Sequence, residues 1–372
     1  MAKREIAIVY DWMDSWGGVE RMLLILNEMF PEAKWYTSYV DEERAQWVRK
    51  LKVKTSFIQS LPSFIKKSRI LSLPFYPYAF ESFDLKGYDL VISVTSSFAK
   101  SVITGPGTRH ICILLTPTRW LWSHGEMYDL GCTNFDLCNP IKSWVVRKMQ
   151  AWDMVAASRP DKIISISQTV ADRCLKYYDR KSEVVYPPFD IEYWKSVKRK
   201  TCNAKRLFFN EYYLIVSRLE PYKKVDLVIV TFNKMKDKKL IIVGKGTQEQ
   251  KLKAIAGENT RFIQDISDQE LADLYLSATA LIMPQEEDFG YVALEAQFFG
   301  CPVIAYAKGG ATETVIPQKT GIFFSDQTVS SLQDAVAEVG CRKYNLGGRY
   351  GHLKRFSKEK FVHKLESLAC DL

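Results

Sequence analysis

Two glutamates, Glu287 and Glu295, are the residues of this 372-residue sequence whose type and spacing most directly suggest chemistry. They stand in the segment EEDFGYVALE, where an apolar run that predicts a strand (280–283) is followed by a pattern that predicts a helix (291–299). Ligands of open parallel sheets bind at the carboxyl ends of strands. Two carboxylates there could accept hydrogen bonds from sugar and ribose hydroxyls. Alternatively, they only complement the positive end of the helix.

Backbone amides between the two glutamates offer a second kind of contact. Phe289, Gly290, Tyr291 and Val292 stand where the helix is expected to begin, and the first amides of a helix have no partner within it. Such amides favour phosphates or sugar hydroxyls as ligands. We therefore expect these four residues to line one ligand site together with the two glutamates.

A basic turn follows another expected strand (212–216). In the segment SRLEPYKK (217–224), Arg218 and Lys223 stand on either side of a proline, so both could be aimed at one anion. Arginine offers a planar fork to phosphate oxygens, and lysine offers a compact charge. Positive groups of this kind stabilise a diphosphate as it departs. A solvated basic turn is the alternative.

Glycines follow several expected strands as well. Gly17-Gly18 comes after the strand at 6–10, and Gly309-Gly310 comes after the strand at 302–305. Glycine lets the backbone approach a ligand closely, although each pair could be a simple tight turn. Gly244-Lys245-Gly246 lacks the third glycine of a dinucleotide-binding fingerprint, which argues against an NAD site.

Two successive series of strands and helices are expected to position these residues. The first series has strands at 6–10, 89–94, 110–115, 162–167 and 182–186, with helices at 19–30 and 140–157. The second has strands at 212–216, 239–243, 260–263, 280–283 and 302–305, with helices at 225–234, 248–256, 268–277 and 291–299. Such alternation favours an α/β fold with mostly parallel sheets.

The restart of the pattern predicts two domains. The first spans residues 1–190, and a basic, patternless stretch at 195–206 is interpreted as a linker. The second spans residues 207–356. The closing segment, 357–372, has one apolar side and predicts a helix.

Composition narrows the class of protein. Hydrophobic residues make up 47% and charged residues 26%, as in an ordinary globular protein. The net charge of +9 suits anionic partners such as phosphorylated small molecules or acidic lipids. Nucleic acid is disfavoured as a partner because no recognised nucleic-acid-binding motif is present.

Cysteine usage and hydropathy indicate a cytoplasmic protein. The eight cysteines form no Cys-x-x-Cys pair, which is typical of reduced thiols and argues against a structural metal. No apolar run approaches the roughly 18–20 residues that span a bilayer. A strand-like run begins near the N-terminus, so we expect no cleavable signal peptide.

Taken together, these segments resemble the retaining glycosyltransferases of family 4, which have the GT-B fold. Within that family the chain is most similar to mannosyltransferases of O-antigen and related surface-polysaccharide assembly. The similarity runs over nearly the whole chain and is carried by 16–21, 84–93, 186–190, 217–226, 286–300 and 309–314.

The resemblance implies a role for each candidate residue. Glu287 would contact the donor sugar as the catalytic residue, and Glu295 would contact the nucleotide ribose. Arg218 and Lys223 match the pair that binds the donor pyrophosphate. Gly18 matches the glycine loop that lines the cleft near the donor phosphate.

The resemblance also implies an architecture and a reaction. Two Rossmann-like domains would face each other across a cleft, with the C-terminal helix returning to the N-terminal domain. A hexose, mannose from GDP-mannose by closest resemblance, would pass with retention of configuration to a glycan or lipid-linked acceptor. We expect no cofactor and no metal, because the sequence has no Asp-x-Asp motif and Arg218, Lys223 and helix N-termini would hold the pyrophosphate instead.

One position departs from the family pattern. The family carries His-Thr-Pro at the end of a strand of the first domain, whereas this sequence has Leu115-Thr116-Pro117. His110 should face the opposite way from Leu115 on the same strand. His124, in the following loop, is the other candidate for a replacement. Leucine cannot donate a hydrogen bond, so the enzyme could be slower, altered in its sugar, or inactive.

Two rival functions therefore stay open. One is a sugar-nucleotide-binding subunit with weak or no catalysis, which Leu115 favours. The other is a sugar-nucleotide epimerase of the same fold, which would need acid and base groups around the sugar.

The acceptor side is marked by aromatic and basic residues. Arg119 and Trp120 could contact an acceptor sugar, or could belong to the core. The segment 57–80 mixes aromatic residues with Lys66, Lys67 and Arg69, so it could lie on anionic lipid at the inner face of the plasma membrane. It could equally be a packed segment with a solvated basic tip.

Overall fold

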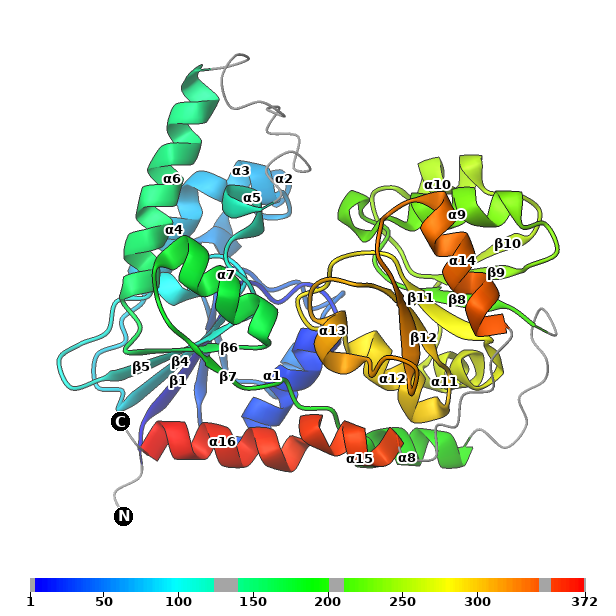
Figure 1. The fold of residues 1–372 in the computed structure, drawn as a ribbon. Coiled ribbons are helices and arrows are strands. Elements are labelled where there is room, and N and C mark those ends of the chain that lie inside the picture. The colour runs from blue at the N-terminus through cyan, green and yellow to red at the C-terminus, as the bar shows by residue number, and fades with distance from the viewer. Residues whose placement is uncertain (1–3, 124–139, 201–210, 341–348, 371–372) are drawn as a thin grey trace. The chain divides into compact units, whose positions relative to one another are not determined.

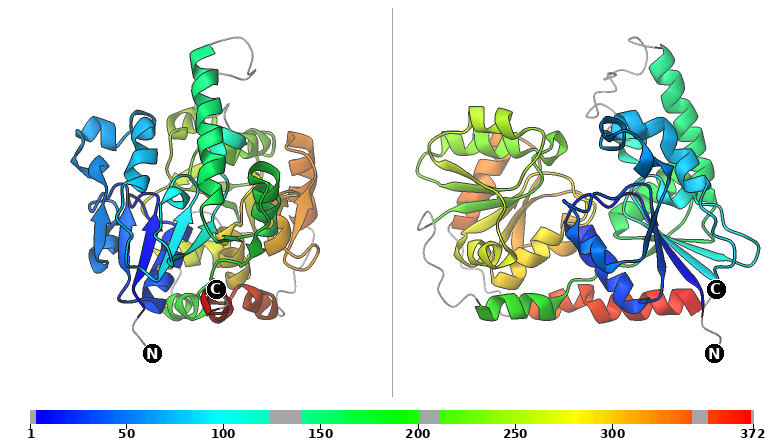
Figure 2. Two further views of the ribbon diagram at one scale, coloured as in Figure 1. Left: turned by 90° about the vertical axis from the view of Figure 1, so that its left-hand side faces the viewer. Right: turned by 180° about the vertical axis from the view of Figure 1, so that it is seen from behind.

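The computed structural model of the chain describes residues 4–123, 140–200, 211–340 and 349–370 (Figure 1). The chain divides into two compact units. The first contains residues 1–188 and 359–372, and the second contains residues 189–358. Each unit has its own parallel sheet, with helices on both faces (Figures 1 and 2).

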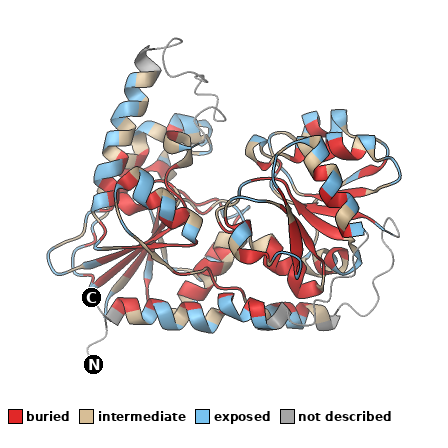
Figure 3. Ribbon diagram, in the orientation of Figure 1, coloured by how far each residue is buried: buried red, intermediate tan, exposed pale blue. Residues whose placement is uncertain are grey.

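The sheet of the first unit has seven strands in the order β3-β2-β1-β4-β5-β6-β7. Their bounds are β1 Ile6–Tyr10, β2 Lys34–Thr37, β3 Val53–Thr55, β4 Leu90–Thr95, β5 Arg109–Leu114, β6 Lys162–Ser165 and β7 Glu183–Val184. All neighbours are parallel, and in the central pair Ile6 lies opposite Leu90. Every residue of β4 is buried, because helices cover both faces of a parallel sheet (Figure 3).

Connections between these strands contain helices of very different length. The α-helices are α1 Gly18–Met29, α2 Ser63–Lys66, α3 Arg69–Ser72, α4 Tyr76–Glu81, α5 Arg119–Trp122, α6 Pro140–Ser158 and α7 Gln168–Tyr178. The 3₁₀ turns are η1 Gln46–Lys50, η2 Phe57–Ser60, η3 Leu73–Phe75 and η4 Ala99–Ser101.

The closing helix, α16 (Lys358–Cys370), belongs to the first unit from Glu359 onward. Its apolar side is buried through Phe361, Leu365 and Leu368. Lys364 also forms an ion pair with Glu183 of β7. The hydrogen bond from Lys364 lowers the pKa of Glu183, so this contact is strongest above the carboxyl's usual pKa.

The sheet of the second unit has six parallel strands in the order β10-β9-β8-β11-β12-β13. The strands are β8 Tyr213–Val216, β9 Leu240–Val243, β10 Thr260–Ile263, β11 Ala280–Met283, β12 Val303–Tyr306 and β13 Gly321–Phe324. The helices are α8 Ile191–Lys200, α9 Val225–Lys234, α10 Glu249–Ile255, α11 Asp268–Ser277, α12 Tyr291–Phe299, α13 Ala311–Thr314, α14 Val329–Gly340 and α15 Arg349–Leu353. The 3₁₀ turns are η6 Pro221–Lys223 and η8 Lys354–Phe356.

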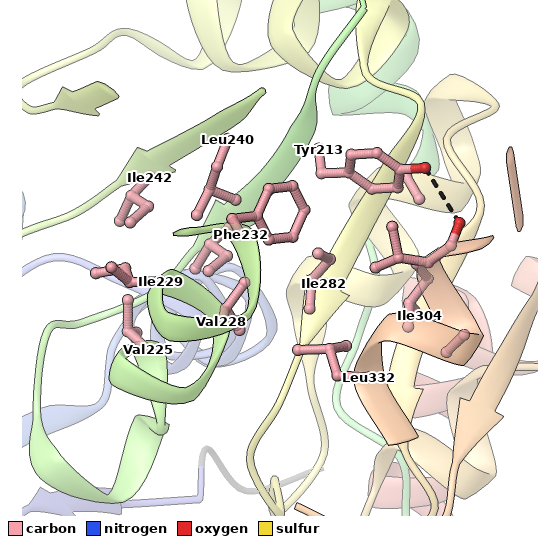
Figure 4. Packing of buried hydrophobic residues seen from close by; sticks show 14 of the residues in the cluster. Tyr213, Val225, Val228, Ile229, Phe232, Leu240, Ile242, Ile282, Ile304 and Leu332 are labelled. Carbon is pink, nitrogen blue, oxygen red and sulfur yellow. Dashed lines mark hydrogen bonds between the residues drawn. The ribbon is translucent and has the colours of Figure 1, made fainter. Parts of the chain in front are cut away.

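The core on one side of this sheet lies between the strands and helices α9 and α14 (Figure 4). Phe232 of α9 packs edge-on against Tyr213 of β8, with ring centroids 5.4 Å apart. The Tyr213 hydroxyl donates to the carbonyl of Val336 in α14 at 3.2 Å. Its phenol therefore joins the sheet to the helix without leaving a buried polar atom unpaired.

Most of the expected elements are confirmed. Strands β1, β10 and β11 and helices α9, α11 and α12 have the expected bounds, and the other expected strands and helices differ by a few residues. Strands β2, β3 and β13 and helices α7, α8 and α14 were not expected. The interpretation of residues 195–206 as a linker is wrong over 195–200, because these residues continue α8.

The expected location in the cell was inferred from cysteine usage and from hydropathy, and the structure describes both features. The described cysteines Cys112, Cys174 and Cys301 are buried free thiols, and burial raises the pKa of Cys112 and of Cys301 to about 12. Among the helices that the structure describes, none is both long and apolar enough to cross a bilayer.

A buried ion pair fixes the loop after β5 in the first unit. Lys100 Nζ lies 2.6 Å from Asp153 Oδ1, and both side chains are only 1% exposed. Asp153 also accepts hydrogen bonds from Thr118 Oγ1 (3.0 Å), Trp122 Nε1 (2.8 Å) and Tyr178 Oη (2.8 Å). This network joins η4, α5, α6 and α7, and the Lys100 ammonium offsets the negative charge of the buried Asp153 carboxylate.

Removing the positive charge should therefore be costly. We expect Lys100→Met to destabilise the protein by about 3–5 kcal/mol, because it leaves a buried carboxylate without its cation. The matched control is Lys52→Met, since Lys52 forms an exposed pair with Glu32 at 3.6 Å and should contribute less than about 1 kcal/mol. Urea unfolding midpoints measure both, and equal midpoints for the two variants would contradict the prediction.

Candidate functional site

The strand order of the second sheet creates a position where loops diverge. From β8 the chain continues to β9 and β10 on one side, whereas β11 leads to β12 and β13 on the other. Strands β8 and β11 are neighbours, so the loops after them leave the carboxyl edge in opposite directions. This is the topological switch point at which open α/β sheets bind ligands.

Lys223 and Glu287 meet at this switch point. Lys223 ends the turn η6 after β8, and Glu287 stands in the loop after β11. The Lys223 Nζ donates to Glu287 Oε1, with the two side chains only 10% and 14% exposed. A second donor, Gln285 Nε2, reaches the same oxygen at 2.6 Å. The structure thus brings together two sequence-predicted residues and one that the sequence analysis did not single out.

Close backbone packing holds the Lys223 loop in place. The amide of Leu219 donates to the carbonyl of Lys245 at 2.8 Å, and the amide of Gln248 donates to the carbonyl of Leu219 at 2.9 Å. A Cβ atom at Gly246 would lie 2.3 Å from the Leu219 carbonyl oxygen, which is too close for any other residue. The Gly244-Lys245-Gly246 segment therefore supports the loop that carries Arg218 and Lys223.

Arg218 lies at the end of the same strand but is not part of the ion pair. Its side chain is exposed, and Nη2 donates to the hydroxyl of Tyr222 at 2.7 Å. Lys223 Nζ lies 5.3 Å from the centre of the Tyr222 ring. Both cations therefore contact one aromatic side chain, which places them on the same turn.

The Glu287 loop is held by the glycine pair after β12. The amide of Gly310 donates to the Glu287 carbonyl at 2.7 Å. Gly309 has a φ of +75°, and a Cβ atom at Gly310 would lie 2.5 Å from Phe289 Cα. The close contact between the two backbones explains why glycine stands at these positions.

Helix α12 begins directly after this loop. Its N-cap, Gly290, has a φ of +90° and supplies no side-chain cap. Tyr291 and Val292 are half-buried, whereas Phe289 is buried and packs against Tyr291 at 5.3 Å. The helix N-terminus thus lies next to Glu287, as expected from the sequence.

Glu295 is held separately, inside α12. It is 6% exposed, and its Oε2 accepts a hydrogen bond from the Tyr275 hydroxyl of α11 at 3.0 Å. Tyr275 was missed because an aromatic residue on a helix gives no sequence signal of such a contact.

The first sheet has its own switch point, between β1 and β4. Gly18 is the first residue of α1, which follows β1. Asp11, at the end of β1, is 1% exposed and accepts hydrogen bonds from the amides of Ser96 (2.7 Å), Phe98 (2.8 Å) and Ala99 (2.7 Å). Asp11 is not among the residues predicted from the sequence to form the site.

The residues expected on the acceptor side stand after β5. Leu115 is buried and donates its amide to the Thr95 carbonyl at 2.8 Å. Arg119 begins α5, and Trp120 packs partly against the apolar core of the unit, in line with the core alternative. His124 lies outside the described residues.

Histidines and clusters of metal-ligating side chains would be further sources of chemistry in the described part of the chain. His110 is fully buried, with Nε2 2.8 Å from Ser93 Oγ, and burial lowers its pKa to about 4. Across the described residues, no group of three or more His, Cys, Asp or Glu side chains is placed to hold a metal ion. The site in the second unit therefore offers a lysine, an arginine and two carboxylates as its chemical groups.

Sequence comparison finds a family model that covers the residues of this site. Residues 205–340 match the family model described as "Glycosyl transferases group 1". A D-inositol 3-phosphate glycosyltransferase of Mycobacteroides abscessus is 26% identical over 199 residues, which are 49% of this chain and 45% of that protein. A GDP-mannose-dependent monoacylated alpha-(1-6)-phosphatidylinositol monomannoside mannosyltransferase of Corynebacterium glutamicum is 32% identical over 158 residues, 38% of this chain and 41% of that protein. The matches thus span less than half of these relatives.

Structural comparison covers the whole chain. The sucrose-phosphate synthase of Thermosynechococcus elongatus has a TM-score of 0.72 at 16% identity and covers 99% of both chains. Anabaena HepE in complex with UDP-glucose has a TM-score of 0.70 at 17% identity, covering 99% of this chain and 100% of that one. These likenesses confirm the expected fold class, GT-B with two Rossmann-like parallel-sheet domains. The Lys223–Glu287 site lies within residues 205–340, the part of the chain that matches the glycosyltransferase group 1 model.

Proposed function

We propose that the protein is a retaining glycosyltransferase that moves a hexose from a nucleotide-sugar donor to a glycan or lipid-linked acceptor. The observation that carries the proposal is the contact of Lys223 with Glu287 at the switch point of a group 1 glycosyltransferase domain. An ammonium group has three donors, so Lys223 can keep Glu287 and still donate to a phosphate oxygen.

The residues of the site have two tasks in the proposed reaction, namely to neutralise negative charge and to position the sugar. The bond between the sugar's anomeric carbon and the diphosphate oxygen breaks, and a bond to the acceptor oxygen forms on the same face. The acceptor's proton passes to the departing phosphate oxygen. Arg218 and Lys223 stabilise the negative charge that accumulates on the diphosphate, and Glu287 orients the sugar. Glu287 is not proposed as a covalent nucleophile.

The remaining donor contacts follow from the same edge of the sheet. Gly290, Tyr291 and Val292 present the first amides of α12 to the donor. Glu295, fixed by Tyr275, accepts hydrogen bonds from the ribose. In the first unit, the resemblance assigns Gly18, at the start of α1, to the donor phosphate, and we propose Arg119 and Trp120 of α5 as acceptor contacts.

Mannose from GDP-mannose is the donor that we propose, for transfer in surface-polysaccharide synthesis. The sequence resemblance and the GDP-mannose-dependent relative of Corynebacterium glutamicum support it. The fold itself does not select the base, because Anabaena HepE has the same fold and was solved with UDP-glucose. A screen of sugar nucleotides for thermal stabilisation identifies the donor, since a ligand that binds only the folded state raises the melting temperature.

The Glu287 carboxylate should be required for turnover. We expect Glu287→Gln to lower kcat for donor hydrolysis or sugar transfer by about a hundredfold to a thousandfold, as removal of other transition-state-stabilising groups does. Its control is Glu286→Gln, which makes the same change at the exposed neighbouring residue and should keep most of the activity. Release of the nucleoside diphosphate from GDP-mannose measures both. Equal loss in the two variants would count against the assignment of Glu287.

Leu115 is the residue that favours the rival function, a sugar-nucleotide-binding subunit. Substitution of Leu115 therefore tests whether the protein is an enzyme. We expect the wild type to turn over its donor, and Leu115→His to raise the rate by about tenfold or more, because it restores a polar group near the developing charge. Donor hydrolysis and transfer to acceptor lipids measure this. Nucleotide binding without turnover in either form would support the binding subunit, and release of an epimerised sugar nucleotide would support an epimerase.

Exposed apolar side chains support contact with a membrane. Phe64 of α2 is 68% exposed, and Ile70 and Leu71 of α3 are 61% and 50% exposed. The two short helices are in contact through the hydrogen bond from Ser72 Oγ to the Ile65 carbonyl (2.7 Å). We propose that this surface lies on the inner face of the plasma membrane, where the acceptor lipid would be reached.

The cations of the same segment are already engaged within the protein. Lys66 Nζ donates to the Gln59 carbonyl at 3.0 Å, Lys67 Nζ lies 3.7 Å from Asp41 Oδ2, and Arg69 is paired with Asp14. Apolar contact should therefore contribute more to membrane binding than attraction to anionic headgroups does.

Binding to lipid vesicles tests whether apolar contact contributes more to membrane binding than attraction to anionic headgroups does. We expect Phe64→Ser/Ile70→Ser/Leu71→Ser to weaken sedimentation with phosphatidylcholine–phosphatidylglycerol vesicles at least tenfold, because it removes three partly inserted apolar side chains. Leu175→Ser, at a 48% exposed position of α7, should have little effect. Binding that is unchanged in the triple variant, or that is abolished by high salt alone, would contradict the proposal.

A further inference from the structure

Gln285 occupies an unusual position between β11 and α12. It is only 2% exposed although it is polar, and it stands two residues before Glu287. Its Nε2 donates to Glu287 Oε1 at 2.6 Å. The amide must point this way, because the reverse orientation would place its oxygen against the carboxylate.

The two donors on Glu287 act on one oxygen. Lys223 Nζ and Gln285 Nε2 both reach Oε1, from the loops after β8 and β11 respectively. The terminal torsion of a glutamate is soft and roughly two-fold, so a carboxylate with a single donor can rotate. Donors from two different loops determine which oxygen faces them and hence how the carboxylate plane is oriented.

The carbonyl oxygen of the Gln285 side chain lowers the stability of the fold. This oxygen, Oε1, is buried and has no hydrogen-bond partner among the residues that the structure describes. A buried carbonyl without a partner destabilises a protein, and an apolar side chain of similar volume would avoid that cost. Among the described residues, Glu287 is the hydrogen-bond partner that the structure gives to this amide.

We propose that Gln285 is a positioning residue that orients Glu287 toward the donor sugar. The proposal rests on the proposed function, because it assigns the effect to the sugar that Glu287 contacts. It predicts an effect on the sugar-dependent step and none on the affinity for the diphosphate, which is assigned to Arg218 and Lys223.

The chain contains a matched control for this residue. Gln297 of α12 is fully buried and donates through Nε2 to the Thr314 carbonyl at 2.9 Å. Within the described part of the chain its Oε1, too, has no hydrogen-bond partner. It differs from Gln285 in that its acceptor is a backbone carbonyl and not a site carboxylate. Gln285→Met and Gln297→Met therefore remove the same amide in similar surroundings.

The experiment compares these variants in the full chain. We expect Gln285→Met to lower kcat/KM for the nucleotide sugar about tenfold to a hundredfold, the effect of losing one hydrogen bond to a charged group. The Kd for the corresponding nucleoside diphosphate should stay within about twofold. Gln297→Met should change the melting temperature but leave kcat/KM within about twofold.

A double-mutant cycle separates positioning from packing. If Gln285 acts through Glu287, then Gln285→Met should cause no further loss in the Glu287→Gln background. A structural role would give the same loss in both backgrounds. Losses that add, or a Gln285→Met enzyme as active as the wild type, would overturn the proposal.

Failure of the proposed function gives a different result, namely a wild type that turns over no nucleotide sugar. In that case calorimetric titration tests Gln285 directly. Wild type should bind the nucleotide sugar more tightly than the nucleoside diphosphate, and Gln285→Met should lose that preference. A preference that is retained in the variant would refute the role of Gln285.

Discussion

The ion pair between Lys223 and Glu287 is the interaction on which the site of the second unit depends. Both side chains are largely removed from water, so each charge needs the other to offset the cost of desolvation. Their loops are positioned by backbone contacts that only glycine permits, at Gly246 against Leu219 and at Gly310 against Phe289. A small set of close contacts thus places a cation and a carboxylate at the carboxyl edge of the sheet.

Much of this arrangement was predictable from the sequence because it follows from strand order and helix periodicity. Continuous apolar runs predicted strands β8 and β11, and the residues directly after those runs had to lie at one edge of a parallel sheet. Short or less apolar strands were missed, such as β2 (KWYT) and β3 (VKT) at the edge of the first sheet. The exposed Lys54 of β3 hides the strand pattern, since an edge strand has fewer buried positions.

Contacts between side chains distant in sequence could not be predicted. Nothing in the sequence around Gln285 distinguishes it from a surface glutamine, and its burial depends on how the β11 loop folds back. The same is true of Lys100 and Asp153, which are separated by 53 positions in numbering yet compensate each other at 2.6 Å. Residues 195–200, the second half of helix α8, were mistaken for part of a linker because basic residues dominate their composition. Trp194, just before them, is buried.

Each unit has a carboxylate at the switch point of its sheet, but the hydrogen-bond donors to the two carboxylates differ. In the first sheet, Asp11 accepts hydrogen bonds from backbone amides of the loop after β4, which cannot move without unfolding that loop. In the second sheet, Glu287 is held by the side chains of Lys223 and Gln285, which can adjust while the backbone stays fixed. A carboxylate held by backbone amides serves structure, whereas one held by side chains can exchange contacts with a ligand. The second switch point is therefore where reversible binding of a charged substrate is physically reasonable.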